Sequence, residues 1–302
     1  MKFFNYKKKL IQLKKDMYYR YVFIIIILLF GAPLKSQIRP SGFGFSTPSP
    51  SSSDPNGSTS ANAASSAYAI KQAYPSSLDG VYWIDLPNEG PTEVYCLMDN
   101  AYDGGGWMLA MKATQGTTFR YSSSYWTSSN TLNTTSLNRS DEDAKYAVMN
   151  EFEAEDIMAI WPDISDIGGE SGSIDGLANW TWLESDFNSG TRITLISKFS
   201  AGQDTKYSSN TAGNVTFDGF NTSVFSKQGN FSFYGFNYSG YTNGKVRWGF
   251  AWNNEANQQS NDVSGGIGMH TNFGYYSAGD KKRCCQTSTG INRKARVEIY
   301  IR

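Results

Sequence analysis

The chain has 302 residues, of which 39% are hydrophobic and only 18% are charged, and Ser, Thr, Asn and Gly fill the difference. This composition suits an extracellular or surface protein of strands and long loops, and it does not suit a helical bundle, in which Ala, Leu, Glu and Lys dominate. Residues 1–36 hold eight of the 27 basic residues and one of the 27 acidic residues, so the remainder carries a net charge of about −7, which argues against nucleic acid as a partner.

Residues 1–36 predict a targeting segment. Six basic residues between positions 7 and 20 precede the run YVFIIIILLFGA, which has the length of a signal-peptide core and is shorter than the roughly 20 residues of a spanning helix. Cleavage after Ser36 would leave Gln37 as the first residue, Met17 offers a second start, and an uncleaved signal-anchor is the alternative. We therefore expect a secreted protein or one on a cell or virion surface, with membrane contact only through this segment if it is uncleaved.

Residues 37–66 predict a flexible stalk. The segment contains four prolines, abundant serine and very few large apolar side chains, so it cannot bury enough surface to fold. The remaining residues, 67–302, are expected to form a compact recognition domain at the end of this stalk.

The start of this domain predicts a short helix followed by three strands. The helix lies in SSAYAIKQAY, with Ser65 or Ser66 as its N-cap and Pro75 after its end. Strands are expected at 79–86 and 92–98, joined by a proline-containing turn, and a third strand follows the glycines of DGGGWMLAMKA, where the backbone must pack closely.

The later elements complete an α+β pattern. Residues 141–160 predict a helix, with a break near Asn150, and strands are expected at 191–199, 244–253 and 295–301. In the strand RWGFAWNN, alternation places Trp248 and Phe250 on one face, which favours core packing for both rings. We expect a mixed or antiparallel sheet with few helices and long polar loops.

At this point the sequence resembles a known family. The segments SSAYAIKQAYPSSLDGVYWIDL, VYCLMD and GGGWMLAMKA resemble the start of a fibrinogen C-terminal-like domain. The C-terminal part is similar to the intelectin branch, in which a strand ending F-N-N-E precedes a glycine run, a G-D pair and a last strand; here these lie at 252–255, 265–268, 279–280 and 297–301. Residues 122–243 match only in general character.

Three departures from the family stand out. Ala67 occupies the place of the first cysteine, so Cys96 lacks its usual partner, and the acidic calcium loop of fibrinogen domains is not recognisable. The only histidine, His270, follows the glycine run, whereas the intelectin histidine precedes it.

Oxygen-bearing side chains crowd the segment NNEANQQSND that follows the Trp-rich strand. Calcium takes six to eight oxygen ligands, and the candidates within ten positions are Asn253, Asn254, Glu255, Asn257, Asn261 and Asp262. The resemblance adds Asp280 and Asp143, and it implies that a bound calcium would coordinate sugar hydroxyls directly. The alternative is that these residues satisfy turns. Glu255 is the strongest single candidate.

Ligand contacts are expected in the glycine-bounded segments after this strand. The candidates are Asn261, His270, Phe273, Tyr275 and Tyr276. Gly265, Gly266 and Gly268 would let the backbone approach a ligand closely, or they form a plain turn.

The three cysteines are Cys96, Cys284 and Cys285. An odd number in an exported chain predicts one unpaired thiol or an intermolecular bond. We favour a strained vicinal disulfide between Cys284 and Cys285 with Cys96 buried and free; the alternative is that one of the pair reaches Cys96.

These features favour a calcium-dependent carbohydrate-binding protein with glycans or glycoconjugates as partners. The alternative is protein–protein adhesion or host recognition by the same fold, with cell-surface proteins or copies of this chain as partners. Seven glycosylation sequons crowd the middle of the domain and would direct binding to residues 244–302 if all were used, namely Asn133, Asn138, Asn179, Asn214, Asn221, Asn230 and Asn237.

We do not expect an enzyme. The chain has one His and no G-x-S-x-G elbow or phosphate loop. The carboxylates that could act on a sugar more simply form the solvated face of a helix, namely Glu151, Glu153, Glu155 and Asp156.

Overall fold

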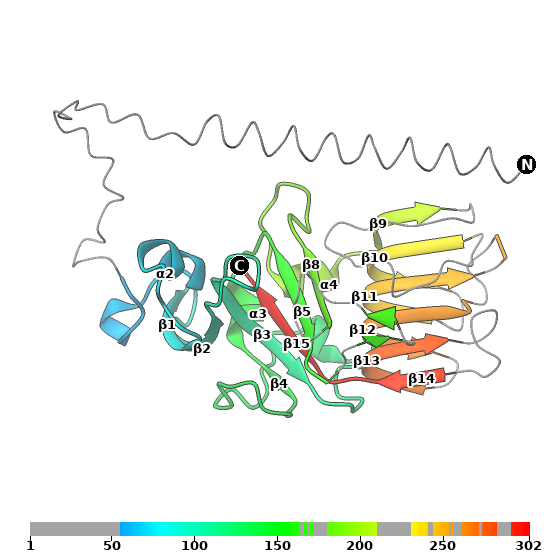
Figure 1. Cartoon of the computed structure of the whole chain (residues 1–302), viewed down its shortest axis with the longest axis horizontal. Helices are drawn as coiled ribbons and strands as arrows, with labels where there is room; N and C mark the ends of the chain where they lie inside the picture. Colours follow the sequence, from blue (N-terminus) through cyan, green and yellow to red (C-terminus); the bar gives the residue numbers. More distant parts are fainter. Residues whose placement is uncertain are drawn as a thin grey trace, which may run out of the picture. The chain divides into compact units, whose positions relative to one another are not determined.

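Two antiparallel sheets and a few short helices make up the described chain in a computed structural model (Figure 1). The structure describes residues 55–163, 166–167, 170–171, 180–209, 231–240, 244–253, 255–256, 261–271, 274–282 and 291–302. All of them belong to one compact unit, Pro50–Arg302. The expected targeting segment lies outside the described residues, and within them no helix has the length and apolar character needed to cross a membrane.

The first sheet is built from segments far apart in the sequence. Its strand order is β1-β2-β3-β15-β5-β8, with the short β4 also paired to β3. The strands are β1 (Gly80–Leu86), β2 (Gly90–Leu97), β3 (Trp107–Ala113), β4 (Ala144–Lys145), β5 (Ile157–Trp161), β8 (Trp180–Glu184) and β15 (Val297–Ile301). The C-terminal strand β15 therefore joins the N-terminal half of this sheet to β5 and β8.

The second sheet is a simple antiparallel meander, because its strands are neighbours in sequence order. They are β9 (Asp204–Ser209), β10 (Phe231–Ser239), β11 (Gly244–Asn253), β12 (Val263–Thr271), β13 (Gly274–Lys282) and β14 (Ile291–Lys294). A small hairpin, β6 (Asp166–Ile167) with β7 (Glu170–Ser171), stands apart from both sheets.

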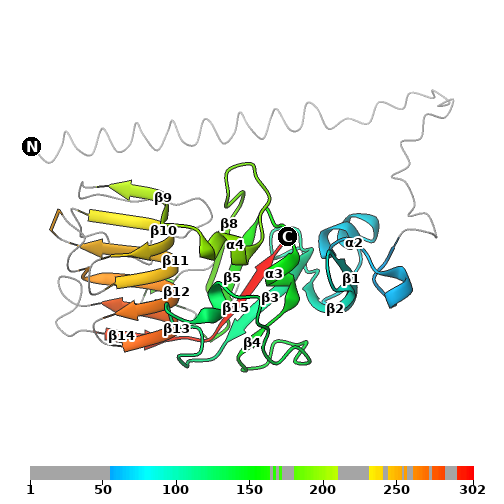
Figure 2. The same cartoon turned by 180° about the vertical axis from the view of Figure 1, so that it is seen from behind.

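The helices are short. They are α2 (Ala67–Ala73), α3 (Ala147–Glu151) and α4 (Leu195–Ser200), with 3₁₀ turns η1 (Ser60–Asn62) and η2 (Ser124–Trp126). The Ser66 hydroxyl caps α2 by accepting a hydrogen bond from the Ala69 amide at 3.0 Å, as expected from the sequence. Helix α3 packs against β3 and α4, and Figure 2 shows α3 and α4 against the first sheet. Antiparallel sheets with few helices confirm the coarse α+β prediction.

Two predicted elements are wrong. Residues 191–199 were expected as a strand, but the Thr194 hydroxyl accepts a hydrogen bond from the Ser197 amide and starts α4. The buried residues of that segment, Leu195, Lys198 and Phe199, have helical spacing.

The expected helix at 141–160 is instead β4, α3 and β5. Every residue of β5, Ile157–Trp161, is buried, because β5 lies between β15 and β8. A continuously apolar run of five residues fits a central strand, and its periodicity does not distinguish it from a buried helix.

Part of the expected stalk, residues 37–66, is folded against the compact recognition domain. The Gly57 carbonyl accepts a hydrogen bond from the Trp83 amide at 2.8 Å, and the Ala64 carbonyl accepts one from the Asp85 amide at 2.9 Å. These two bonds attach residues 57–64 to β1 and cover part of that edge strand, so this part of the expected stalk belongs to the compact unit.

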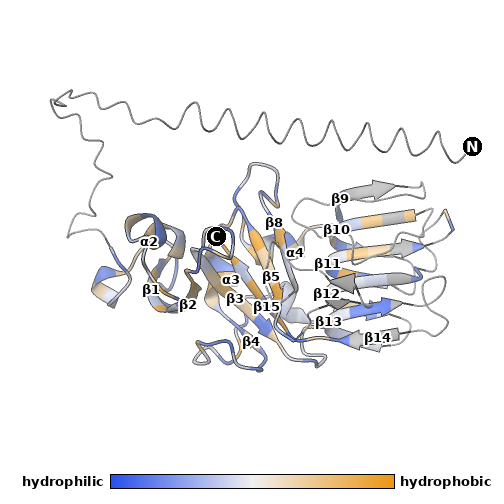
Figure 3. Cartoon of the chain, in the orientation of Figure 1, coloured by the Kyte–Doolittle hydropathy of each residue, from blue (hydrophilic) through white to orange (hydrophobic). Residues whose placement is uncertain are grey.

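Aromatic side chains fill the core between the two sheets. Trp182 of β8 meets the ring of Trp248 of β11 edge-on, with centroids 5.7 Å apart. Trp248 and Phe250 are fully buried, which confirms their expected core role. Figure 3 shows hydrophobic residues concentrated in β5, whose sequence is IMAIW.

The glycines of β12 let two strands approach closely. A Cβ atom on Gly266 would lie 2.2 Å from the Trp248 carbonyl oxygen, and one on Gly249 would lie 2.0 Å from the Gly265 carbonyl oxygen. The close partner of these glycines is therefore the neighbouring strand and not a ligand, and Gly265, Gly266 and Gly268 lie within β12 rather than in a turn.

Candidate functional site

A loop that follows β3 of the first sheet docks on the second sheet. The Ser277 amide donates to the Gly116 carbonyl at 2.9 Å, and the Phe119 amide donates to the Ser277 hydroxyl at 3.1 Å. Further along, the Tyr121 amide approaches the Met269 carbonyl at 3.5 Å. These contacts place Arg120 and Tyr121 beside β12 and β13.

The second sheet presents a row of three polar and aromatic side chains at this position. Lys245 of β11 is directly opposite His270 of β12, and His270 is directly opposite Tyr275 of β13. Directly opposite residues in antiparallel strands share one face of the sheet. The rings of His270 and Tyr275 are accordingly in contact, with centroids 4.5 Å apart, and Tyr275 is 49% exposed.

Cationic groups lie over the tyrosine rings of this row and its loop. The Arg120 guanidinium carbon is 5.9 Å from the centroid of the Tyr275 ring, and the Lys245 ammonium is 5.8 Å from that of Tyr121. We call Arg120, Tyr121, Lys245, His270 and Tyr275 the His270 surface.

Arg247 contacts Tyr121 and holds this part of the surface in position. Its guanidinium lies 4.4 Å from the Tyr121 ring centroid, and its Nε donates to the Tyr121 carbonyl at 2.8 Å. Its NH1 group donates to the Phe199 carbonyl at 3.0 Å and to the Asn237 side-chain oxygen at 3.1 Å. Arg247 thereby fixes Tyr121, and through it the loop that carries Arg120.

The charges of the His270 surface have one sign. In the part of the chain that the structure describes, no carboxylate forms an ion pair with Arg120, Lys245 or Arg247. Burial, and secondarily the nearby charge of Lys245, lower the pKa of His270 below its ordinary value. His270 is therefore mostly neutral at neutral pH, while Arg120 and Lys245 supply fixed positive charge.

The sequence anticipated part of this surface. The structure brings His270 and Tyr275 together, whereas Tyr276 is buried on the opposite face and packs with Met269. Asn261 is also buried, and its amide donates to the Tyr238 hydroxyl at 3.0 Å. Tyr276 and Asn261 are therefore interior residues and not surface contacts, and Phe273 lies outside the described residues.

Sequence reasoning did not identify Arg120, Tyr121 or Lys245 as site residues. The loop residue Phe119 and its partner Ser277 are 158 positions apart, so no local pattern connects the two segments. The only local signal was the dipeptide Arg120-Tyr121, a cation next to an aromatic residue, and such dipeptides are common in proteins.

Two of the expected calcium ligands, Asp280 and Asn253, lie on opposite faces of the second sheet. Asp280 is opposite Gly265, which is opposite Phe250, so Asp280 shares the face of Phe250. Asn253 shares the face of Ala251, on the other side of the sheet. Two strand spacings and three residues separate Asp280 from Asn253, roughly 10 Å across the sheet and roughly 10 Å along it, so these two residues cannot share one ion.

The other expected ligands differ in their exposure to solvent. Asp262 is buried, Glu255 is exposed at the surface, and Asn254 lies outside the described residues. Among the described residues, no group of three or more His, Cys, Asp or Glu side chains is arranged to hold a metal ion.

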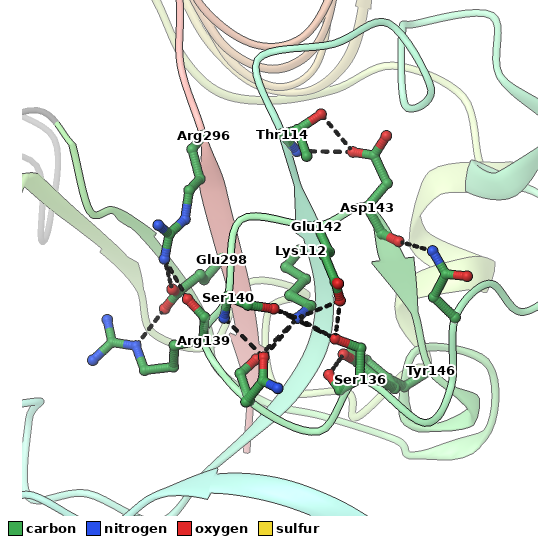
Figure 4. A network of polar contacts seen from close by, with 12 residues as sticks. Lys112, Thr114, Ser136, Arg139, Ser140, Glu142, Asp143, Tyr146, Arg296 and Glu298 are labelled. Carbon is green, nitrogen blue, oxygen red and sulfur yellow. Dashed lines mark hydrogen bonds and ion pairs between the residues drawn. The ribbon is translucent and has the colours of Figure 1, made fainter.

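Asp143 has a different role, in the loop that leads to the His270 surface. Its Oδ1 atom accepts hydrogen bonds from the Thr114 amide at 2.8 Å and the Thr114 hydroxyl at 3.1 Å, as Figure 4 shows. Its Oδ2 atom accepts one from the Thr118 hydroxyl at 2.6 Å. Asp143 thus fixes the first half of the loop whose second half carries Arg120.

A lysine ammonium occupies the centre of an oxygen-rich loop next to Asp143 (Figure 4). Lys112 is 1% exposed, and its Nζ donates to Ser136 Oγ at 2.8 Å, Ser140 Oγ at 2.9 Å and two oxygens of Asn138 at 3.1 and 3.2 Å. Glu142 lies 3.8 Å away. Hydroxyl, amide and carbonyl oxygens arranged in this way stabilise a cation, and here that cation is part of the chain.

The carboxylates considered for catalysis serve mostly structural contacts. Glu151 accepts hydrogen bonds from the Asn88 and Glu89 amides, at 2.8 and 3.2 Å, and so holds the turn between β1 and β2. Glu155 pairs with Arg192 at 3.2 Å, and Asp156 pairs with Arg302 at 2.8 Å. Glu151 and Glu153 line an open cavity of about 570 Å³ together with Arg192.

The His270 surface is the arrangement of described residues best suited to a soluble ligand. An exposed tyrosine ring can pack against the apolar face of a sugar ring, and neighbouring N–H groups can donate to its hydroxyls. No protein-family model and no curated protein matches the sequence.

Proposed function

We propose that this protein is an exported recognition protein whose head binds carbohydrate at the His270 surface. The observation that carries the proposal is the contact between His270 and the half-exposed Tyr275 ring, with Lys245 beside His270 and Arg120 over the ring. Tyr275 supplies an apolar face for a sugar ring, and the three nitrogen-bearing side chains supply donors for sugar oxygens.

We further propose that the head is a fibrinogen C-terminal-like domain close to the intelectin branch. Helix α2 with its Ser66 cap, the β1–β2 hairpin and the glycines before β3 support this proposal, since they are formed by the segments that carry the resemblance. The basic and apolar leader at 1–36 supports export.

Calcium dependence stays a prediction. When bound, calcium would supply direct coordination of sugar hydroxyls. Because Asp280 and Asn253 face opposite sides of the second sheet, the described residues do not provide the expected ligand set, and the proposed sugar contacts do not depend on it.

A glycan array tests the proposal directly. The purified chain is screened with calcium and with a chelator, together with Tyr275→Ala and the control Tyr68→Ala. Tyr68 is a suitable control because it is 46% exposed and also lies under a guanidinium, that of Arg302. We expect Tyr275→Ala to lose glycan binding at least tenfold and Tyr68→Ala to retain it.

Two results would contradict the proposal. If the unmodified chain binds no glycan in either buffer, carbohydrate recognition is wrong. If it binds glycans and Tyr275→Ala binds them equally well, the His270 surface is not the site. Loss of binding in chelator alone would support the calcium prediction.

A second candidate function is protein adhesion. Three large apolar side chains are exposed at the α2 and β1 end of the first sheet: Leu78 at 79%, Tyr68 at 46% and Val81 at 44%. Neighbouring exposed apolar residues beside an edge strand favour contact with another protein. Cell binding that survives enzymatic deglycosylation of the cells and is lost in Leu78→Asp would favour adhesion.

A further inference from the structure

We propose that the ligand of the His270 surface is an acidic saccharide, one that carries a carboxylate or sulfate group. This inference rests on the proposed carbohydrate-binding function and adds the charge of the ligand. It follows from the number, the pairing and the geometry of the cationic groups at this surface.

The cations of the His270 surface, and Arg247 next to it, lack the carboxylate partners that two other arginines of this chain have. Arg139 pairs with Glu298 at 2.7 Å, and Arg302 pairs with Asp156 at 2.8 Å. In the described chain, Arg120 and Lys245 have no carboxylate within ion-pairing distance, and the groups that contact Arg247 are neutral oxygens and a tyrosine ring. Three positive charges therefore lie close together without a counter-charge among the described residues.

The proximity of these positive charges is unfavourable in the free protein, and the binding of an anion is therefore favoured. Burial lowers the pKa of His270 most, and the charge of Lys245 lowers it further, because a nearby positive charge disfavours protonation of the imidazole. No group of the described chain that faces His270 from β11, β13 or the loop is negative: these are Lys245, Tyr275 and Arg120. A bound carboxylate or sulfate would relieve the repulsion and would meet charge-assisted donors.

The donors of Arg120 and Lys245 are open to a ligand. Among the described residues, only the Nε of Arg120 makes a hydrogen bond, to Ser122 Oγ at 3.3 Å, and the Lys245 ammonium faces only the Tyr121 ring. The guanidinium fork matches the two oxygens of a carboxylate, while an ammonium acts as a point charge.

The two cations stand at opposite ends of the row. Lys245 begins it, opposite His270, and Arg120 lies over Tyr275 at its far end. A sugar ring that packs on Tyr275 therefore has a cation within reach on either side. Two strand spacings, roughly 10 Å, separate the first and last residue of the row, which is the size of one or two sugar rings.

Calorimetry with matched saccharides tests the inference. The probes are sialyllactose, the uncharged lactose and a sulfated disaccharide, each titrated into the full chain at low and high salt. We expect an acidic probe to bind at least tenfold more tightly than lactose, and its affinity to fall as salt rises. Lys245→Gln and Arg120→Gln are each expected to weaken the acidic probe by roughly tenfold and lactose little.

Lys294→Gln is the matched control. The Lys294 ammonium lies 5.5 Å from the Tyr276 ring centroid, so it repeats the cation–tyrosine contact away from the His270 surface. It should leave the affinity for every probe unchanged, and equal melting temperatures of all variants would show that they are folded.

The outcomes separate the two proposals. If lactose binds as tightly as the acidic probes and Tyr275→Ala abolishes binding, carbohydrate recognition stands and the acidic ligand is wrong. If no saccharide binds, both are wrong. If the Lys245→Gln and Arg120→Gln variants bind the acidic probes as tightly as the unmodified chain does, other residues contact the acidic group of the ligand. This inference is then wrong.

Discussion

Lys245 and His270 lie directly opposite each other in β11 and β12. Burial lowers the pKa of His270 most, and the nearby Lys245 ammonium lowers it further. Because His270 is the only histidine of the chain, its titration can be followed without assignment by NMR on the untagged protein. We expect a pKa below the ordinary value of about 6.5.

Lys245→Gln should raise the pKa of His270, and Lys294→Gln should leave it unchanged. In the folded chain His270 binds its proton less readily than in the unfolded chain, so the free energy of unfolding should decrease as pH falls below about 6.5. Affinity for an acidic saccharide should increase over the same pH range, since protonation adds a positive charge. A pKa at or above the ordinary value would contradict this account.

Lys112 should contribute strongly to stability, because its ammonium satisfies four oxygen atoms in an interior position. Lys112→Met should lower the free energy of unfolding by about 2 kcal/mol, since the loop that holds Ser136, Asn138 and Ser140 loses the charged donor that it surrounds. Denaturant unfolding measures the change.

Lys145→Met is the control for Lys112. Lys145 is equally buried, but its ammonium donates only to the Ser128 carbonyl among the described residues, and burial alone lowers its pKa to about 8. We expect a loss of less than about 1 kcal/mol, because methionine replaces the charge with an apolar chain of similar volume. Equal losses in the two variants would show that the oxygens around Lys112 do not matter.

Asn237 should remain unglycosylated in any host, although it begins an N-x-S sequon. It is 4% exposed, its amide donates to the Lys198 carbonyl at 2.8 Å, and its backbone is left-handed with a φ of 52°. Asn133 is the matched comparison, because it also begins a sequon and also has a positive φ, of 46°, but is exposed.

Peptide mapping after expression in a glycosylating host checks this difference. Asn237→Ala should also destabilise the fold by about 2 kcal/mol, through its lost hydrogen bonds and its strained backbone. A glycan found on Asn237 would mean that the β10–α4 packing opens during folding.

Cys96 should be inert in the folded protein. It is fully buried without a disulfide, and burial raises the pKa of its thiol. A thiol reagent should therefore label Cys96 only after unfolding. In denaturant without reductant, one reactive thiol per chain would support the predicted bond between Cys284 and Cys285, which lie outside the described residues, and three would contradict it.

The sequence predicted best those elements whose signals are local. The serine before α2 caps a short helix, and the turn between β1 and β2 contains Pro87 and Asn88, so both elements follow from neighbouring residues. It failed for β5 and α4, because segments this short with several apolar residues fit either structure, and only the elements that pack against them decide.

The candidate site shows the same limit at a larger scale. His270 and Tyr275 lie on consecutive strands, so a close approach between them was within reach of sequence reasoning. Arg120 arrives on a loop from the other sheet, held by Ser277 and fixed at its start by Asp143. Asp143 was expected to bind calcium, and nothing in its neighbourhood along the chain indicated that its oxygens accept from Thr114 and Thr118.

The place of β15 between β3 and β5 has a consequence for biosynthesis. Strands β3 and β5 emerge early, but they share no direct pairing and must wait for β15, which is synthesised only after the whole second sheet. Until then each exposes an unpaired edge, a state in which chains associate wrongly or attract chaperones. The second sheet is a local meander and can form first. The first sheet would then be completed against it, when β15 inserts between β3 and β5.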